Sequence, residues 1–210
     1  MMSASATIAT ANRASVSEQS EEQKMVKKVA VSSFLGNFIE WFDYASYSYF
    51  ATTIALVFFP SDNHTVAMLQ TFGVFALSFV LRPIGALFWG NLGDKKGRKD
   101  ALAISIMFMS GASFLIGCLP SYAAIGIFAP VLLLLLRMVQ GFSASGEYAG
   151  AATFLGEYAP TKKRGIYCSL IPASTAIGLL AGSTLATVMT ASLSSDALTS
   201  WGWRVPFLMA

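Results

Sequence analysis

The chain has 210 residues, of which 55% are apolar and 12% are charged, and its formal net charge is +3. A soluble domain of this size cannot bury so much apolar surface, so the composition excludes an ordinary globular protein and indicates a polytopic, all-α membrane protein. The two cysteines, Cys118 and Cys168, form no C-x-x-C pair, which argues against a zinc site or a disulfide framework.

The predicted elements begin with a tail at residues 1–28, rich in Ser, Ala and Thr and then charged, which is expected to be disordered and cytoplasmic. Crossing a bilayer takes about 20 apolar residues. The transmembrane bundle predicted for 29–210 has spans at about 29–59, 66–90, 101–119, 125–149 and 165–191, and a sixth begins at 202–210. Only six residues follow Arg204, so the sixth span is expected to be truncated.

The basic residues favour one side of the membrane. Ten of the 14 Lys and Arg lie directly before the first span (residues 24–28), between the second and third, or between the fourth and fifth. The loops at 60–65, 120–126 and 192–203 contain none. The positive-inside rule therefore predicts a multi-pass protein of the plasma membrane (a bacterial inner membrane) with a cytoplasmic N-terminus. This distribution also explains the net charge without a nucleic-acid partner.

The loop at 90–100, GNLGDKKGRKD, is the densest run of charge in the chain. Topology alone requires only basic residues there, and does not explain Asp94 or the glycines. Gly90 is expected to allow close approach of helices, and Gly97 to permit a tight turn. Asp94 can pair with a cation or with helix N-terminal amides, and Arg98 can bind a carboxylate with two hydrogen bonds. Such a loop can hold two helical bundles together in one conformational state.

This loop resembles the signature G-x-x-x-D-[RK]-x-G-R-[RK] of the major facilitator superfamily at every defined position. GEYAPTKKRG at 156–165 resembles a second facilitator loop, which implies ion pairing by Glu157 and Arg164. Arg137-x-x-x-Gly141 is similar to a fourth-span motif of proton-coupled members. The segments GNFIEWFDY, LRPIGALFWGNLGD and WGWRVPF resemble the metabolite:proton symporter family, and the closest likeness is to its osmoregulatory proline/betaine transporters. One departure is Ser145, where the family pattern has glycine.

The resemblance implies the N-terminal six-helix bundle of a major facilitator fold, with five complete spans and a truncated sixth. It further implies a second six-helix half that this sequence lacks, so the 210 residues are expected to be a fragment that does not transport alone. The expected partners are the lipid bilayer, a small-molecule substrate and the missing half. The coupling ion is expected to be a proton, with no cofactor and no metal.

Ionisable groups inside spans are functional candidates because they are costly there. From the helical rise of about 1.5 Å per residue, Glu40, Asp43 and Arg137 lie near the midplane, whereas Arg82 and Glu147 lie nearer the cytoplasm. Further polar candidates fall on or near the Glu40 face: Asn37, Tyr44 and Tyr47. We expect one carboxylate to take the coupling proton and Arg137 to hold a substrate carboxylate.

Several alternatives remain open for these charges. The site can instead be a static ion-paired packing site, with Glu40 bonded to Arg82 or Arg137. Glu147 suits a structural or a gating role equally. The aromatic run WFDYASYSYF suits either packing or a cage for a quaternary ammonium.

The sequence thus predicts a secondary active transporter, a proton symporter for a small zwitterionic or carboxylated metabolite, with a proline/betaine-type solute preferred. A 2-oxoglutarate, citrate or other dicarboxylate symporter is the alternative substrate class, and a non-transporting scaffold or sensor is the alternative function. An enzyme is not expected, because Ser143 and the single histidine, His64, are placed at opposite membrane faces.

Overall fold

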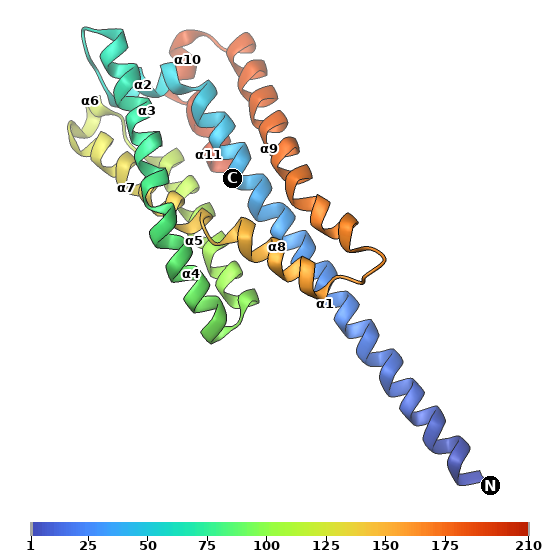
Figure 1. Ribbon diagram of the computed structural model, residues 1–210. Helices are drawn as coiled ribbons and strands as arrows, with labels where there is room; N and C mark the ends of the chain where they lie inside the picture. Colours follow the sequence, from blue (N-terminus) through green and yellow to red (C-terminus); the bar gives the residue numbers. More distant parts are fainter. Residues whose placement is uncertain (1, 210) are drawn as a thin grey trace.

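The computed structural model describes residues 2–209, with the side chains of residues 2–23, 98, 147–149 and 154 left out of the description. Every element in this part of the chain is a helix. The long helices run roughly side by side, and their connections gather at two ends of the bundle (Figure 1). We name the end with the α4–α5 and α8–α9 loops the basic end, because Lys95 and Lys163 lie there.

The first span is formed by α1 (Met2–Tyr49) and α2 (Ala51–Phe58), which meet at a break at Phe50. The structure differs here from the disordered tail predicted for residues 1–28, because α1 continues back to Met2 and projects away from the bundle (Figure 1). The tail contains neither glycine nor proline and is rich in Ala, Glu, Gln and Lys, which favour helix. The sequence analysis gave too much weight to its polarity.

The remaining spans match the predicted segments with two further breaks. α3 (His64–Val80) and α4 (Arg82–Lys96) meet at Leu81, where Pro83 in the first turn of α4 favours a new helix start. α7 (Phe128–Ala144) and α8 (Glu147–Tyr158) meet at residues 145–146. The unbroken spans are α5 (Arg98–Cys118) and α9 (Arg164–Ser192). Short helices occupy two loops and the last residues: α6 (Tyr122–Ile125), α10 (Ser195–Ser200), η1 (Gly202–Arg204) and α11 (Val205–Met209).

Three helical stretches of the described chain are long and apolar enough to cross a membrane: His64–Lys96, Lys99–Cys118 and Arg164–Ser192. The break at 145–146 leaves Phe128–Ala144 as a shorter apolar helix. The first predicted span carries Asn37, Glu40 and Asp43, which lower its mean hydropathy. A segment that is helical, buried and polar on one face is typical of helices that line a functional interior.

Glycines bring the helices of this bundle into close contact. A Cβ at Gly178 or Gly182 of α9 would lie 2.7 Å from the carbonyl oxygen of Phe38 or Phe42 of α1. A Cβ at Gly141 of α7 would collide with the carbonyl of Ser78 of α3. Small residues allow such backbone contact, which replaces the hydrophobic effect as the source of packing energy in a bilayer. α9 is therefore held close against α1, and α7 is held close against α3.

Ser145, the departure from the family pattern, is accommodated by a glycine on the facing helix. Its hydroxyl donates a hydrogen bond of 2.7 Å to the carbonyl of Phe142. It lies directly against Gly85 of α4, where any Cβ would overlap the serine oxygen. Ser145 and Gly85 thus form a matched pair of small residues where α4 meets the break between α7 and α8.

Candidate functional site

The first buried ion pair joins α1 to the start of α4. Arg82 follows the break at Leu81, and its Nη2 donates to Glu40 Oε1 at 2.5 Å and to the hydroxyl of Tyr44. The Glu40 side chain is only 3% exposed, whereas that of Arg82 is 28% exposed. A buried carboxylate is therefore neutralised by an arginine that can still reach solvent or a ligand.

Aromatic rings surround the Arg82 guanidinium. Its central carbon lies 4.6 Å from the ring centre of Phe79 and 5.3 Å from that of Tyr44. Phe75 completes the group, with ring centres 5.4 Å from Tyr44 and 5.3 Å from Phe79. A cation over aromatic faces at these distances is stabilised by the ring quadrupoles. Phe75 and Phe79 could not be identified from the sequence, because no pattern distinguishes them from the other phenylalanines of apolar α3.

The second ion pair is sealed inside the bundle. Arg137 Nη1 of α7 donates to Asp43 Oδ2 of α1, and both side chains are 0% exposed. Gln140 accepts from Arg137 at 2.8 Å and donates to Asp43 Oδ1 at 3.2 Å. Ser113 of α5 donates to Asp43 at 3.2 Å and accepts from Gln140 at 2.7 Å. This network links three helices by hydrogen bonds between charged and polar side chains.

Aromatic rings also cover the second arginine. The Arg137 guanidinium lies 3.9 Å from the ring centre of Tyr47 and 5.4 Å from that of Phe207. Its Nε and Nη2 have no hydrogen-bond partner among the described residues. The Tyr47 hydroxyl donates to the carbonyl of Thr71 at 2.9 Å, away from the charges. The described residues therefore enclose the Arg137 side chain completely.

The structure thus divides the predicted midplane cluster into separate groups. Tyr44 lies in the group of Glu40 and Arg82, and the Tyr47 ring packs against Arg137 in the group of Asp43. Asn37 belongs to neither group. Its amide nitrogen donates to residues of α9: to Ser174 at 2.8 Å, to Thr175 at 2.7 Å and to the carbonyl of Ile171 at 3.0 Å. It therefore ties α1 to α9 and does not contact the ion pairs.

Arg82, expected nearer the cytoplasm than Glu40, nevertheless reaches Glu40 with its side chain. The alternative in which Glu40 bonds to Arg82 matches the structure, and Arg137 bonds to Asp43 instead of standing free for a substrate. The helical rise fixes only Cα height, whereas an arginine side chain reaches along the helix. The sequence also missed Gln140 and Ser113. Gln140 lies three residues after Arg137 and so shares its face, whereas Ser113 gave no signal.

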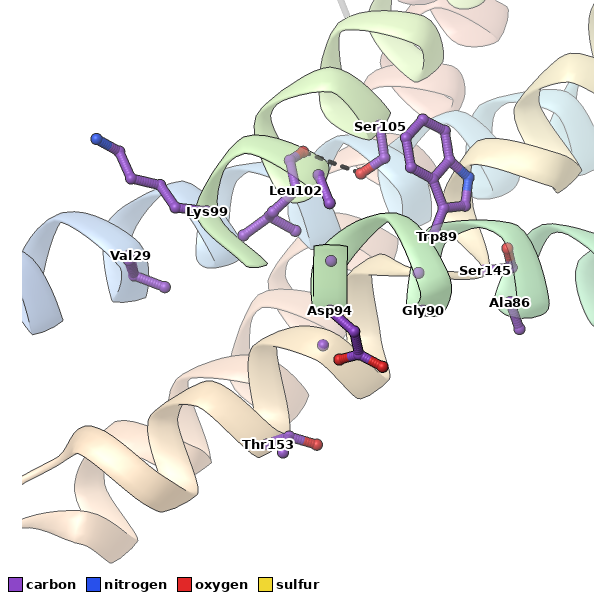
Figure 2. Close-up of a pocket in the computed structure, with 14 residues that line it drawn as sticks. Val29, Ala86, Trp89, Gly90, Asp94, Lys99, Leu102, Ser105, Ser145 and Thr153 are labelled. Atoms are coloured by element: carbon purple, nitrogen blue, oxygen red, sulfur yellow. Dashed lines mark hydrogen bonds between the residues drawn. The ribbon is translucent and has the colours of Figure 1, made fainter. Parts of the chain in front are cut away.

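The signature loop surrounds a cavity at the basic end. About 270 Å³ in volume, it lies between α1, α4, α5 and α8 and is lined by Trp89, Gly90, Asp94, Lys99 and Ser105, among others (Figure 2). Gly97 has φ +98° at the end of α4, which confirms the tight turn. The close helix approach predicted at Gly90 is wrong, because a Cβ there would meet nothing within 4 Å. Gly90 instead lines the cavity.

Other predicted latch residues are not paired in the described part of the chain. Asp94 and Lys99 both line the cavity, and their side chains extend in different directions (Figure 2). Glu157 and Arg164 are exposed, and no ion pair joins them. The side chains of Arg98 and Glu147 lie outside the described residues. Their expected roles stay predictions.

Comparison with known proteins agrees with this architecture. The Sugar (and other) transporter family matches residues 28–210. A proline/betaine transporter of Salmonella typhimurium is 43% identical over 185 residues, covering 88% of this chain and 37% of its own length. The glycine betaine/proline/ectoine/pipecolic acid transporter OusA of Dickeya dadantii is 42% identical with the same coverage. A putative proline/betaine transporter of Staphylococcus aureus is 43% identical over 90% of this chain and 41% of its own length.

Among solved structures, the major facilitator proton:xylose symporter XylE bound to 6-bromo-6-deoxy-D-glucose superposes with a TM-score of 0.76. At 17% identity, covering 90% of this chain and 42% of XylE, this likeness shows the fold. The chain spans about 37% of the length of the first curated relatives. The predicted helical bundle of a major facilitator fold is confirmed, and the chain belongs to the Sugar (and other) transporter family of the major facilitator superfamily.

Proposed function

We propose that this bundle forms one half of a proton-coupled secondary transporter for a small zwitterionic solute of the proline/betaine type. The observation that carries the proposal is the Glu40–Arg82–Tyr44 group, a buried carboxylate paired with a partly exposed arginine. Such a pair offers a cation to a substrate carboxylate and a carboxylate to a proton. The names of the Salmonella and Dickeya relatives support this substrate class, and the name of XylE supports proton coupling.

The two arginines have different roles in this proposal. Arg82, at 28% exposure, binds the substrate carboxylate. Arg137 is sealed on Asp43, so it holds α7 against α1. This assignment differs from the sequence expectation, in which Arg137 binds substrate. A dicarboxylate substrate is less well suited, because only one of the two arginines is accessible.

Transport requires a second bundle to close the site, supplied by the same polypeptide or by another chain. We propose that the basic end faces the cytoplasm of a bacterial inner membrane and that its loop at 90–100 holds the two bundles together in one state. Single-cysteine labelling tests the orientation: Asn63→Cys and Ser194→Cys are expected to react from outside, and Lys163→Cys is not. The reverse pattern would refute it.

The transport test uses a carrier that joins residues 1–210 to the remainder of the Salmonella relative, which we name the joined carrier. In cells lacking their own osmolyte carriers, it is expected to accumulate radiolabelled glycine betaine and proline when an inward proton gradient is imposed. Accumulation should stop when a protonophore removes the gradient. If neither solute is taken up although the joined carrier is present in the membrane in normal amounts, the proposed function is overturned.

A further inference from the structure

We infer that the rings of Tyr44 and Phe79, supported by Phe75, form a binding box for a quaternary ammonium group, and that Arg82 occupies it until substrate arrives. This inference rests on the proposed function and identifies the part of the site that selects the substrate. The substrate it points to is a betaine, with a permanent cation at one end and a carboxylate at the other.

The box already holds a cation. The Arg82 guanidinium lies over Phe79 at 4.6 Å and over Tyr44 at 5.3 Å, within the range of cation–π attraction. The three rings contact one another with centre distances of 5.3 to 5.7 Å, and each pair is tilted or edge-on. Tyr44 and Phe79 therefore each turn a face toward the guanidinium, while Phe75, which stacks on Tyr47 at 5.4 Å, supports them by edge-on contact. A trimethylammonium group presents charge of the same sign, spread over methyl groups that aromatic faces accept.

The box is also accessible. Phe79 is 40% exposed and the Arg82 side chain is 28% exposed. The comparable group around Arg137 is closed, because that arginine has no exposed surface and Asp43 binds it directly. Of the two arginine–aromatic groups that contact α1 in the described chain, the one at Arg82 can therefore exchange its cation for a ligand, and the one at Arg137 cannot.

Exchange accounts for proton coupling. When the substrate ammonium enters the box, the guanidinium moves out and binds the substrate carboxylate, so its hydrogen bond to Glu40 breaks. Glu40 is then a buried, unpaired carboxylate, which is costly in a bundle interior. A proton from solvent, which reaches the site beside the partly exposed Arg82, binds to the freed carboxylate oxygen and removes that cost. The other charged groups nearest Glu40, Asp43 and Arg137, neutralise each other throughout.

The test compares glycine betaine with 3,3-dimethylbutanoate, its carbon isostere, which keeps the shape and the carboxylate but lacks the cation. Both compete with radiolabelled betaine for uptake by the joined carrier. The expected result is that the isostere binds at least ~10-fold more weakly than betaine, since cation–π attraction is the main difference between them. Phe79→Leu should weaken betaine by roughly 10-fold and leave the isostere almost unchanged, while Phe79→Tyr keeps the preference.

The control is Phe114→Leu on α5, an exposed phenylalanine outside the site, which should change neither affinity. A merely structural role of Phe79 would lower both affinities together, and an unchanged ratio in Phe79→Leu would overturn the inference. If that variant does not reach the membrane, competition uptake by the unmodified joined carrier still tests the inference, because equal affinity for betaine and its isostere refutes the box. Uptake of proline and betaine without this preference would refute the box alone, whereas no uptake at all would refute the proposed function.

Discussion

Two carboxylate–arginine pairs lie one helical turn apart on α1, and they differ in burial far more than in chemistry. Glu40 pairs with Arg82, which begins a helix after a break and is 28% exposed. Asp43 pairs with Arg137, which lies in the middle of α7 and is 0% exposed. Each carboxylate is followed four residues later by a tyrosine on the same side of the helix. The difference teaches that accessibility, not the presence of charge, separates a binding site from a structural contact.

The largest effect is expected from removing one partner of the sealed pair. Arg137→Leu leaves Asp43 as an uncompensated charge at 0% exposure, which should lower the free energy of unfolding by about 3–5 kcal/mol. Thermal unfolding in detergent and the amount of protein in the membrane measure this effect. Replacing both partners, in Asp43→Leu with Arg137→Met, should restore most of the stability. A stable, abundant Arg137→Leu single variant would show that the pair is not a structural contact.

Glu40→Gln should remove function and preserve the fold. The amide still accepts a hydrogen bond from Arg82 but takes up no proton at physiological pH. The joined carrier with this change is expected to reach the membrane normally and to exchange substrate across it, yet to lose accumulation driven by a proton gradient. Uptake with an imposed proton gradient measures accumulation, and counterflow without a gradient measures exchange. Gradient-driven accumulation at the parent level would place the proton site elsewhere.

The contrast between the pairs also shows what could be read from sequence. Apolar segment lengths predicted five complete spans, because crossing a bilayer sets their length, and helices occupy each of the predicted segments. The spacing of Glu40 and Asp43 put both on one face of a helix. It did not show that they face different arginines, since partner choice depends on the break at Leu81 and on the crossing of α7, both tertiary features. The helix at residues 2–28 was missed because its propensity was judged from polarity.

A smaller effect is expected within the network around the sealed pair. Gln140 bonds to Arg137, Asp43 and Ser113, so Gln140→Met removes hydrogen bonds from two buried charges at nearly constant volume. We expect a loss of about 1–3 kcal/mol in the free energy of unfolding, with little change in substrate affinity. Gln70→Met, at an exposed position of α3, is the matched control. A change in affinity without a change in stability would mean that the sealed pair takes part in binding.

The smallest effects should come from the two tyrosine hydroxyls, and they should differ in kind. The Tyr47 hydroxyl donates to the carbonyl of Thr71, so Tyr47→Phe should cost about 1 kcal/mol of stability and leave betaine affinity unchanged. The Tyr44 hydroxyl bonds to Arg82, so Tyr44→Phe keeps the aromatic face and removes only that contact. Since the contact holds Arg82 in the box, its loss should ease the exchange and raise apparent betaine affinity a few-fold, while the preference over 3,3-dimethylbutanoate stays. Competition uptake and thermal unfolding of both variants provide the comparison. If Tyr44→Phe loses stability and Tyr47→Phe alters affinity, then the open and sealed pairs have been assigned the wrong way round.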